Sequence, residues 1–78
     1  ANSVVLPEET QLLFDALKAV RLRLAREQGV PPYVVFHDAT LRAMAMEKPA
    51  GIGEMMTLPG VGKAKLDRYG EAFLRELN

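Results

Sequence analysis

Two glycines followed by lysines form the sharpest chemical signal in this sequence. Gly60 and Gly62 stand in the run Leu58-Pro59-Gly60-Val61-Gly62, and Lys63 and Lys65 follow directly. Glycine lets the backbone turn tightly, and amides at the start of a helix attract a phosphate through hydrogen bonds and the helix dipole. The pattern is therefore consistent with a phosphate-binding turn. The alternative is that the glycines only let two helices pack closely, which is the commoner use of glycine in helix connections.

The same glycines do not fit the two common nucleotide-binding loops. A P-loop would need glycine in place of Thr57 and serine or threonine in place of Ala64. A dinucleotide-binding loop would need a third glycine in place of Lys65, after a strand that the sequence does not provide. The order apolar, any residue, glycine, apolar, glycine instead matches the core of a helix-hairpin-helix turn. We expect no ATP site and no cofactor.

The second signal is an aromatic residue near several basic ones. Tyr33 follows Pro31 and Pro32, which stiffen the chain, so its ring could be presented to solvent as a platform for an unpaired base. The basic residues of the preceding segment are Lys18, Arg21, Arg23 and Arg26. Aromatic rings beside cations are typical of single-strand nucleic-acid sites. The alternative, commoner for an isolated tyrosine, is that Tyr33 packs on the preceding helix and the basic residues are a solvated face.

The other candidates for chemistry are weaker. His37 is the only histidine and stands beside Asp38, but a hydrolytic triad also needs a nucleophile and an oxyanion site, and neither is recognisable. One histidine without cysteine or a spaced carboxylate pair falls short of a metal site. We interpret Asp38 as a helix cap and the four methionines as core filler. No catalytic residue and no metal site is expected.

The residues that would position these groups have helical periodicity. An apolar stripe is formed by Leu13, Leu17, Val20 and Leu24. Its spacing of four, three and four residues predicts a helix over residues 6–28 with one buried face. Gly29 and the following prolines end that helix. Residues 33–36 could form a strand, but no second strand pattern exists to pair with it, so a turn or short helix is expected.

The second half of the chain predicts further short helices. Asp38 begins one whose inner face consists of Leu41, Met44 and Ala45. We expect a loop over residues 49–53, a single helical turn over residues 54–56, and a helix after the glycine turn. Gly70 is expected to cap or kink that last helix. The predicted fold class is all-α, a compact bundle of about five short helices with a helix-hairpin-helix-like glycine turn.

Composition limits the classes of partner. The 78 residues, 49% of them hydrophobic, suffice for one domain, which we place at residues 6–78 after a tail or expression scar at residues 1–5. Ten basic and ten acidic residues give no net charge, so nucleic-acid binding must come from a local patch and should be weak. No apolar run suits a membrane span, and we expect a cytoplasmic protein without a membrane partner.

Taken together, these features resemble the HRDC domain, which is named for its occurrence in helicases and at the C-terminus of RNase D. The resemblance covers residues 12–77. The run Val30-Pro31-Pro32-Tyr33-Val34-Val35-Phe36, followed by Asp38-Ala39-Thr40-Leu41, is similar to the hallmark of bacterial RecQ HRDC domains. Gly60-Val61-Gly62, then Lys65-Leu66 and Arg68-Tyr69-Gly70, is similar to a second hallmark. The resemblance implies a five-helix bundle joined to a helicase core, with no chemistry of its own.

The resemblance also implies a function. In several members a patch binds single-stranded or partly single-stranded DNA; the family tyrosine corresponds to Tyr33, and Lys18, Arg21 and Lys65 match basic positions of the family. We therefore expect weak DNA binding by an accessory domain that associates with the nucleoid when bound. The candidate residues are Lys18, Arg21, Arg26, Tyr33, Gly60, Gly62, Lys63 and Lys65. The alternative is a module that docks on its own helicase core or on another protein, which the neutral charge favours.

Overall fold

The computed structural model describes residues 6–78, so the tail expected at residues 1–5 lies outside the described residues. Over this range the helices are α1 (Glu8–Gln28), α2 (Pro32–Val35), α3 (Asp38–Glu47), α4 (Ile52–Met55) and α5 (Lys63–Leu77). No strand occurs among residues 6–78, and the predicted all-α bundle of five helices is confirmed. None of these helices combines the length and the apolar character that a membrane span requires.

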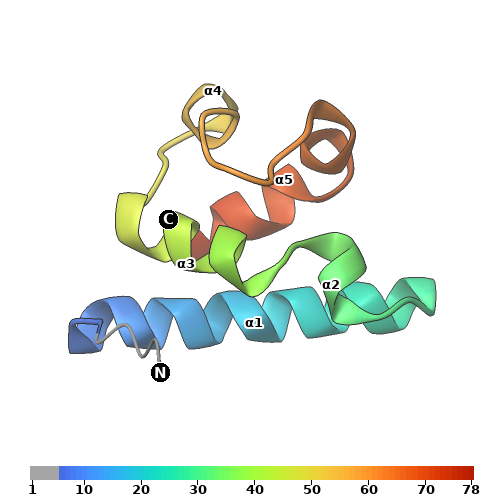
Figure 1. Ribbon diagram of the computed structural model, residues 1–78, viewed down its shortest axis with the longest axis horizontal. Coiled ribbons are helices and arrows are strands. Elements are labelled where there is room, and N and C mark those ends of the chain that lie inside the picture. Colours follow the sequence, from blue (N-terminus) through green and yellow to red (C-terminus); the bar gives the residue numbers. More distant parts are fainter. Residues whose placement is uncertain (1–5) are drawn as a thin grey trace.

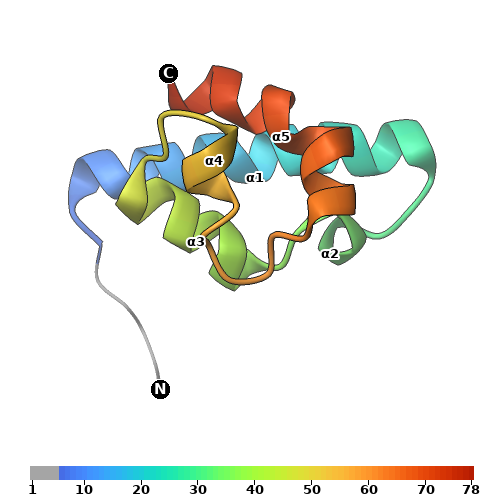
Figure 2. The ribbon, with the colours of Figure 1, turned by 90° about the horizontal axis from the view of Figure 1, so that it is seen from above.

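The long helix α1 is the platform on which most of the bundle is built. Helices α2, α3 and α5 all pack against α1, whereas α4 packs on α5 in the layer farthest from α1 (Figure 1). Figure 2 shows α2 beside the N-terminal turns of α5, so the segment carrying Tyr33 lies close to the helix that follows the glycine turn.

The ends of α1 follow from its sequence. Glu8 and Glu9 lie in its first turn, where negative charge is favourable to the helix dipole, and Arg26 lies in its last. Gly29 takes the left-handed conformation, with φ of 67°, and its amide bonds back into the last turn of α1. The predicted end of the helix at this glycine is confirmed, and glycine suits the position because a left-handed backbone strains most other residues.

The buried face of α1 is broader than the predicted stripe. Leu17 and Val20 are buried as expected, whereas Leu13 and Leu24 are only half-buried. Phe14 and Ala25 are also buried and were not part of the predicted stripe. The face is wider on the side of Phe14 because α3 packs on that side of α1.

An aromatic cluster joins the segment after α2 to α5. Phe36 follows α2 and is fully buried. Its ring packs edge-on against Phe73, at a centroid distance of 5.2 Å, and against Tyr69, at 6.1 Å. The Tyr69 hydroxyl donates a hydrogen bond of 2.8 Å to Oε1 of Gln28, at the end of α1. The end of α1, the segment after α2 and helix α5 are thus joined by direct contacts.

Several details of the second half differ from the sequence prediction. Leu41, Met44 and Ala45 form the buried face of α3 as predicted. The cap of α3 is His37, which makes no side-chain capping hydrogen bond, so the assignment of Asp38 as the cap was wrong. Asp38 is instead the first residue of α3, and its carboxylate pairs with an arginine of α1. Helix α4 begins at Ile52, inside the stretch predicted to be a loop.

Gly70 does not end α5, which is helical from Lys63 to Leu77. The glycine is buried where α4 meets α5. A Cβ atom at this position would lie 3.0 Å from Cδ1 of Ile52 and 3.0 Å from Cδ1 of Leu66. The predicted cap at Gly70 was therefore wrong, because this glycine serves the close approach of α4 and α5.

The glycine turn between α4 and α5 is held against α3. Gly60 has φ of 81°, and a Cβ atom there would collide with Oγ1 of Thr40. The Thr40 hydroxyl donates a hydrogen bond of 3.0 Å to the carbonyl oxygen of Pro59. Packing against Thr40 thus accounts for Gly60, the first glycine of the turn. The interpretation of the turn as a phosphate-binding site remains a prediction.

Replacing Gly60 by alanine should destabilise the domain strongly. The Gly60→Ala substitution adds both left-handed strain and a collision with Thr40, and we expect it to lower the free energy of unfolding by at least about 2 kcal/mol. Urea unfolding followed by circular dichroism measures this. The matched control is Gly53→Ala in α4, where a Cβ atom would meet nothing within 4 Å and alanine favours the helix, so this substitution should leave the stability unchanged or raise it by up to about 1 kcal/mol. Equal effects of the two substitutions would contradict the explanation.

Candidate nucleic-acid interface

Tyr33 lies at the rim of an open hollow where α1, α2 and α3 meet. Pro32 occupies the first position of α2, where its fixed φ suits a helix start, and the next residue, Tyr33, is turned outward with 59% of its surface exposed. The residues lining the hollow, which measures about 540 Å³, are Arg21, Pro32, Tyr33, His37, Asp38 and Ala39. A large exposed aromatic ring is therefore presented beside a concave surface that Arg21, His37 and Asp38 line together with apolar groups.

His37 contributes a second ring to the same hollow. Its imidazole lies nearly parallel to the Tyr33 ring, with an interplanar angle of 23° and a centroid distance of 6.0 Å. Sequence reasoning set His37 aside as an isolated histidine. No helical spacing relates His37 to Tyr33, because the backbone is extended at Phe36 and His37, and only the fold brings the two rings together.

Arg21 lies in the wall of the hollow, but its guanidinium already has protein partners. Its side chain is only 12% exposed, and Nη1 donates to the Phe36 carbonyl oxygen at 3.0 Å and contacts Oδ1 of Asp38 at 2.6 Å. Its Nε is buried without a hydrogen-bond partner among residues 6–78. Arg21 thus joins α1 to the start of α3, and a phosphate would have to compete with Asp38 for it.

This ion pair changes the acidity of Asp38. The hydrogen bond from Arg21 lowers the pKa of the Asp38 carboxyl below its ordinary value. Partial desolvation opposes this shift of the pKa, and the positive charges of Arg21, Lys18 and Arg42 reinforce it. Three cations from α1 and α3 therefore surround one carboxylate at the edge of the hollow.

Two of those cations share one aromatic ring. Nζ of Lys18 lies 4.6 Å from the centroid of the Phe14 ring, and the guanidinium carbon of Arg42 lies 5.3 Å from it. Lys18 also pairs with Asp15 at 3.5 Å. Arg42 was not a predicted site residue, since only the packing of α3 on α1 brings it to Lys18.

Lys65 lies on the other side of α2. Its stem is half-buried, and its Nζ is 5.9 Å from the centroid of the buried Phe36 ring. The second hollow, beside α2 and α5, is lined by Val34, Ala64, Lys65, Arg68 and Tyr69. Arg68 was not a predicted site residue. Its place one turn after Lys65 on the same helix was the available signal.

The remaining predicted residues do not converge on these two hollows. Arg26 is exposed in the last turn of α1, and its place five residues after Arg21 puts it about 140° around the helix axis from that residue. Lys63 is exposed and pairs with Asp67, one turn along α5, at 3.1 Å. Gly60 and Gly62 lie in the exposed turn that leads into α5. Within residues 6–78 no three His, Cys, Asp or Glu side chains gather to hold a metal ion.

Comparison with known proteins gives this arrangement a family. The family model of the HRDC domain matches residues 11–77. The chain belongs to the HRDC domain family. The solved structure of D. radiodurans RecQ HRDC domain 3 is similar to this HRDC domain with a TM-score of 0.87 and 35% identity, over 91% of this chain and 93% of that one.

Two helicases show what kind of protein carries such a domain. The ATP-dependent DNA helicase RecQ of Bacillus subtilis is 45% identical over 69 residues, which are 88% of this chain and 12% of the helicase. The ATP-dependent DNA helicase UvrD2 of Mycobacterium tuberculosis is 46% identical over 59 residues, which are 76% of this chain and 8% of that protein. The chain thus corresponds to a small part of the length of these relatives. The expected likeness to bacterial RecQ HRDC domains is confirmed.

The Arg21–Asp38 pair should make stability depend on pH. Because the pKa of Asp38 is lower in the folded state, the ionised carboxylate stabilises the fold above the unfolded value of about 3.9. This contribution is lost as the pH falls through the folded pKa. The Asp38 side chain is 61% exposed, so we expect Asp38→Asn to lower the free energy of unfolding at pH 7 by no more than about 1 kcal/mol.

The measurement is urea unfolding of wild type and Asp38→Asn at neutral pH and at about pH 2.5. The difference in stability should nearly vanish at the acidic end. Asp67→Asn is the matched control, because Asp67 makes an exposed pair within one helix, and its effect at pH 7 should be about 0.3 kcal/mol. A stability difference for Asp38→Asn that stays the same at both pH values would contradict the assigned role of the pair.

Proposed function

We propose that this HRDC domain is a non-catalytic accessory part of a RecQ-type DNA helicase that binds single-stranded or partly single-stranded DNA weakly and helps the helicase to select its substrate. The observation that carries the proposal is the exposed ring of Tyr33 at an open hollow that Arg21 and His37 also line. Tyrosine is usually at least partly covered by its own protein, whereas a base can stack on a ring that is left open.

The flanking charges support phosphate contacts on both sides of the ring. Lys18 and Arg42 lie where α1 meets α3, and Lys65 and Arg68 lie beside the second hollow. In this proposal a base stacks on Tyr33 while the adjoining backbone phosphates reach these two basic groups. The backbone amides near Gly60 and Gly62, with Lys63 next to them, offer further phosphate contacts at the glycine turn. Together with the two basic groups they form the proposed phosphate track.

The same geometry argues that binding is weak. Lys18, Arg21 and Lys63 each have a carboxylate within ion-pair distance. A phosphate gains less from a cation that is already paired, and few released counterions mean a small electrostatic contribution to affinity. Arg21, being largely buried, acts in this proposal mainly by positioning the hollow, and Arg26 remains a peripheral candidate.

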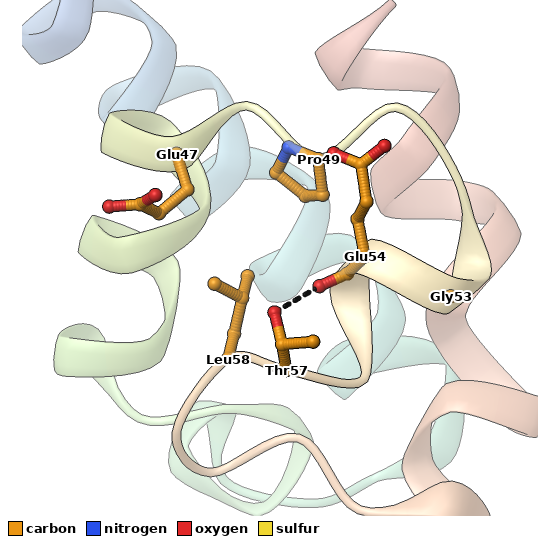
Figure 3. A pocket seen from close by; sticks show the side chains of 6 residues that line it. All are labelled: Glu47, Pro49, Gly53, Glu54, Thr57 and Leu58. Carbon is orange, nitrogen blue, oxygen red and sulfur yellow. Dashed lines mark hydrogen bonds between the residues drawn. The ribbon is translucent and has the colours of Figure 1, made fainter.

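A second candidate function is docking on the helicase core or on another protein, and a separate surface favours it. The lining residues of a smaller hollow near α3 and α4 are Glu47, Pro49, Gly53, Glu54, Thr57 and Leu58 (Figure 3). Within its lining, the Thr57 hydroxyl donates a hydrogen bond of 2.7 Å to the carbonyl oxygen of Glu54. The two glutamates make this surface unsuited to phosphate, and Ile52 and Met56 are exposed near it. A protein partner fits such a surface better than DNA does.

Removing the ring of Tyr33 should weaken DNA binding. We expect Tyr33→Ala to raise the Kd for a labelled single-stranded oligonucleotide by about fivefold or more, because stacking on an aromatic contributes about 1–3 kcal/mol per base. Fluorescence anisotropy at low salt measures this. Leu12→Ala is the control, since Leu12 is similarly exposed, at 62%, but lies in the first half of α1. Binding that is absent at low salt, or unchanged in Tyr33→Ala, would favour the docking function instead.

Removing Lys65 should change the salt dependence of binding. Each phosphate contact to single-stranded DNA contributes about 0.7 to the slope of log K against log salt concentration. We therefore expect Lys65→Ala to reduce that slope by roughly 0.7. Arg75→Ala, in the last turn of the same helix, is the control and should leave the slope unchanged. Equal slopes for wild type and Lys65→Ala would remove Lys65 from the phosphate track.

A further inference from the structure

We propose that His37 is a second DNA contact beside Tyr33 and that its protonation makes binding of single-stranded DNA stronger at mildly acidic pH. The inference rests on the proposed DNA-binding function and adds to it a residue and a regulation. It starts from the near-parallel rings of Tyr33 and His37, 6.0 Å apart, which line one hollow. Rings at this distance already contact each other, so a base cannot insert between them. The two rings instead form one continuous aromatic surface, here called the aromatic ledge.

The backbone holds the imidazole at this ledge. The carbonyl oxygen of His37 accepts hydrogen bonds from the amides of Thr40, at 3.0 Å, and Leu41, at 3.2 Å. The preceding residue, Phe36, is fully buried, and the following residue, Asp38, is paired with Arg21. The ring itself is exposed and makes no side-chain capping hydrogen bond. The backbone of His37 is therefore held at this position while its side chain is exposed to solvent, where a phosphate can approach it.

The neighbouring charges leave His37 as the group that sets the charge of the hollow. Arg21 from α1 and Asp38 from α3 face it as a mutually neutralising pair, and Tyr33 from α2 lines the same hollow. Lys18 and Arg42 also act on the Asp38 carboxylate. The hydrogen bond from Arg21 lowers the pKa of Asp38 below its ordinary acidic value, so this carboxylate does not change charge between pH 5 and 8. Histidine is the side chain that ordinarily changes charge between pH 5 and 8.

The consequence for DNA follows from these positions. A base on the open face of Tyr33 brings its adjoining sugar and phosphate along the ledge toward His37. A neutral imidazole offers that phosphate a single N–H donor, whereas an imidazolium offers two donors and a positive charge. Protonation thus adds one phosphate contact at an exposed position, a gain equivalent to about two- to fivefold in affinity.

The experiment is fluorescence anisotropy of labelled oligothymidylate between pH 5.5 and pH 8 at constant ionic strength, with wild type, His37→Phe and His37→Ala. Wild type should bind about two- to fivefold more tightly at pH 5.5 than at pH 8. His37→Phe keeps the ring without the charge, so it should bind like wild type at pH 8 and lose the pH dependence. His37→Ala should bind more weakly than His37→Phe at every pH. Circular dichroism checks that both variants fold.

The outcomes separate this inference from the function on which it rests. If wild type binds in a Tyr33-dependent way but His37→Phe shows the same pH dependence, His37 is not the titrating contact and the inference is overturned. The same holds if wild type binds equally at pH 5.5 and pH 8. If wild type does not bind at any pH in this range, the proposed DNA-binding function falls together with the inference.

Discussion

The position of Phe36 is the constraint on which the rest of this HRDC domain depends. Its ring is fully buried against Tyr69 and Phe73 of α5, and its carbonyl oxygen is held by Arg21 of α1. Side chain and backbone of one residue thus join the first and last helices. Tyr33 lies one helical turn before Phe36 and His37 directly after it, so the exposed rings are placed by a residue that solvent does not reach. A rigid core position is what lets an exposed ring serve as a platform.

Arg21 shows how one residue type can support two interpretations. From the sequence it is a cation near the edge of the apolar stripe, and such a residue predicts a phosphate contact. In the fold it lies in the inner face of α1, where its guanidinium bridges the Phe36 carbonyl and the Asp38 carboxylate. Burying a charge is tolerated only where it is paired and hydrogen-bonded, and both conditions are met here. Sequence periodicity cannot distinguish this role from a surface one, because the partners come from other helices.

The same distinction explains which parts of the structure could be predicted. The five helices, the end of α1 at Gly29 and the inner face of α3 depend on local periodicity and on glycine or proline, and the sequence was sufficient for them. The cap of α3 and the uninterrupted course of α5 through Gly70 depend on contacts with other helices, and these were predicted wrongly. Arg42 and His37 were missed as members of the candidate site for the same reason, since only the packed bundle places them near the predicted residues, whereas Arg68 could have been found from its place one turn after Lys65.

Weak binding is consistent with the proposed role, in which this domain is a small part of a longer helicase chain, as the matching segments of its two relatives are. A module tethered to a core that already holds DNA meets that DNA at a high effective concentration, so a modest intrinsic affinity is enough to bias which strand is engaged. A strongly basic surface would instead hold any nucleic acid nearby, regardless of its structure. The carboxylates beside Lys18, Arg21 and Lys63 reduce that non-specific attraction. What remains is stacking on an exposed ring, which requires an unpaired base and so favours single-stranded over fully paired DNA.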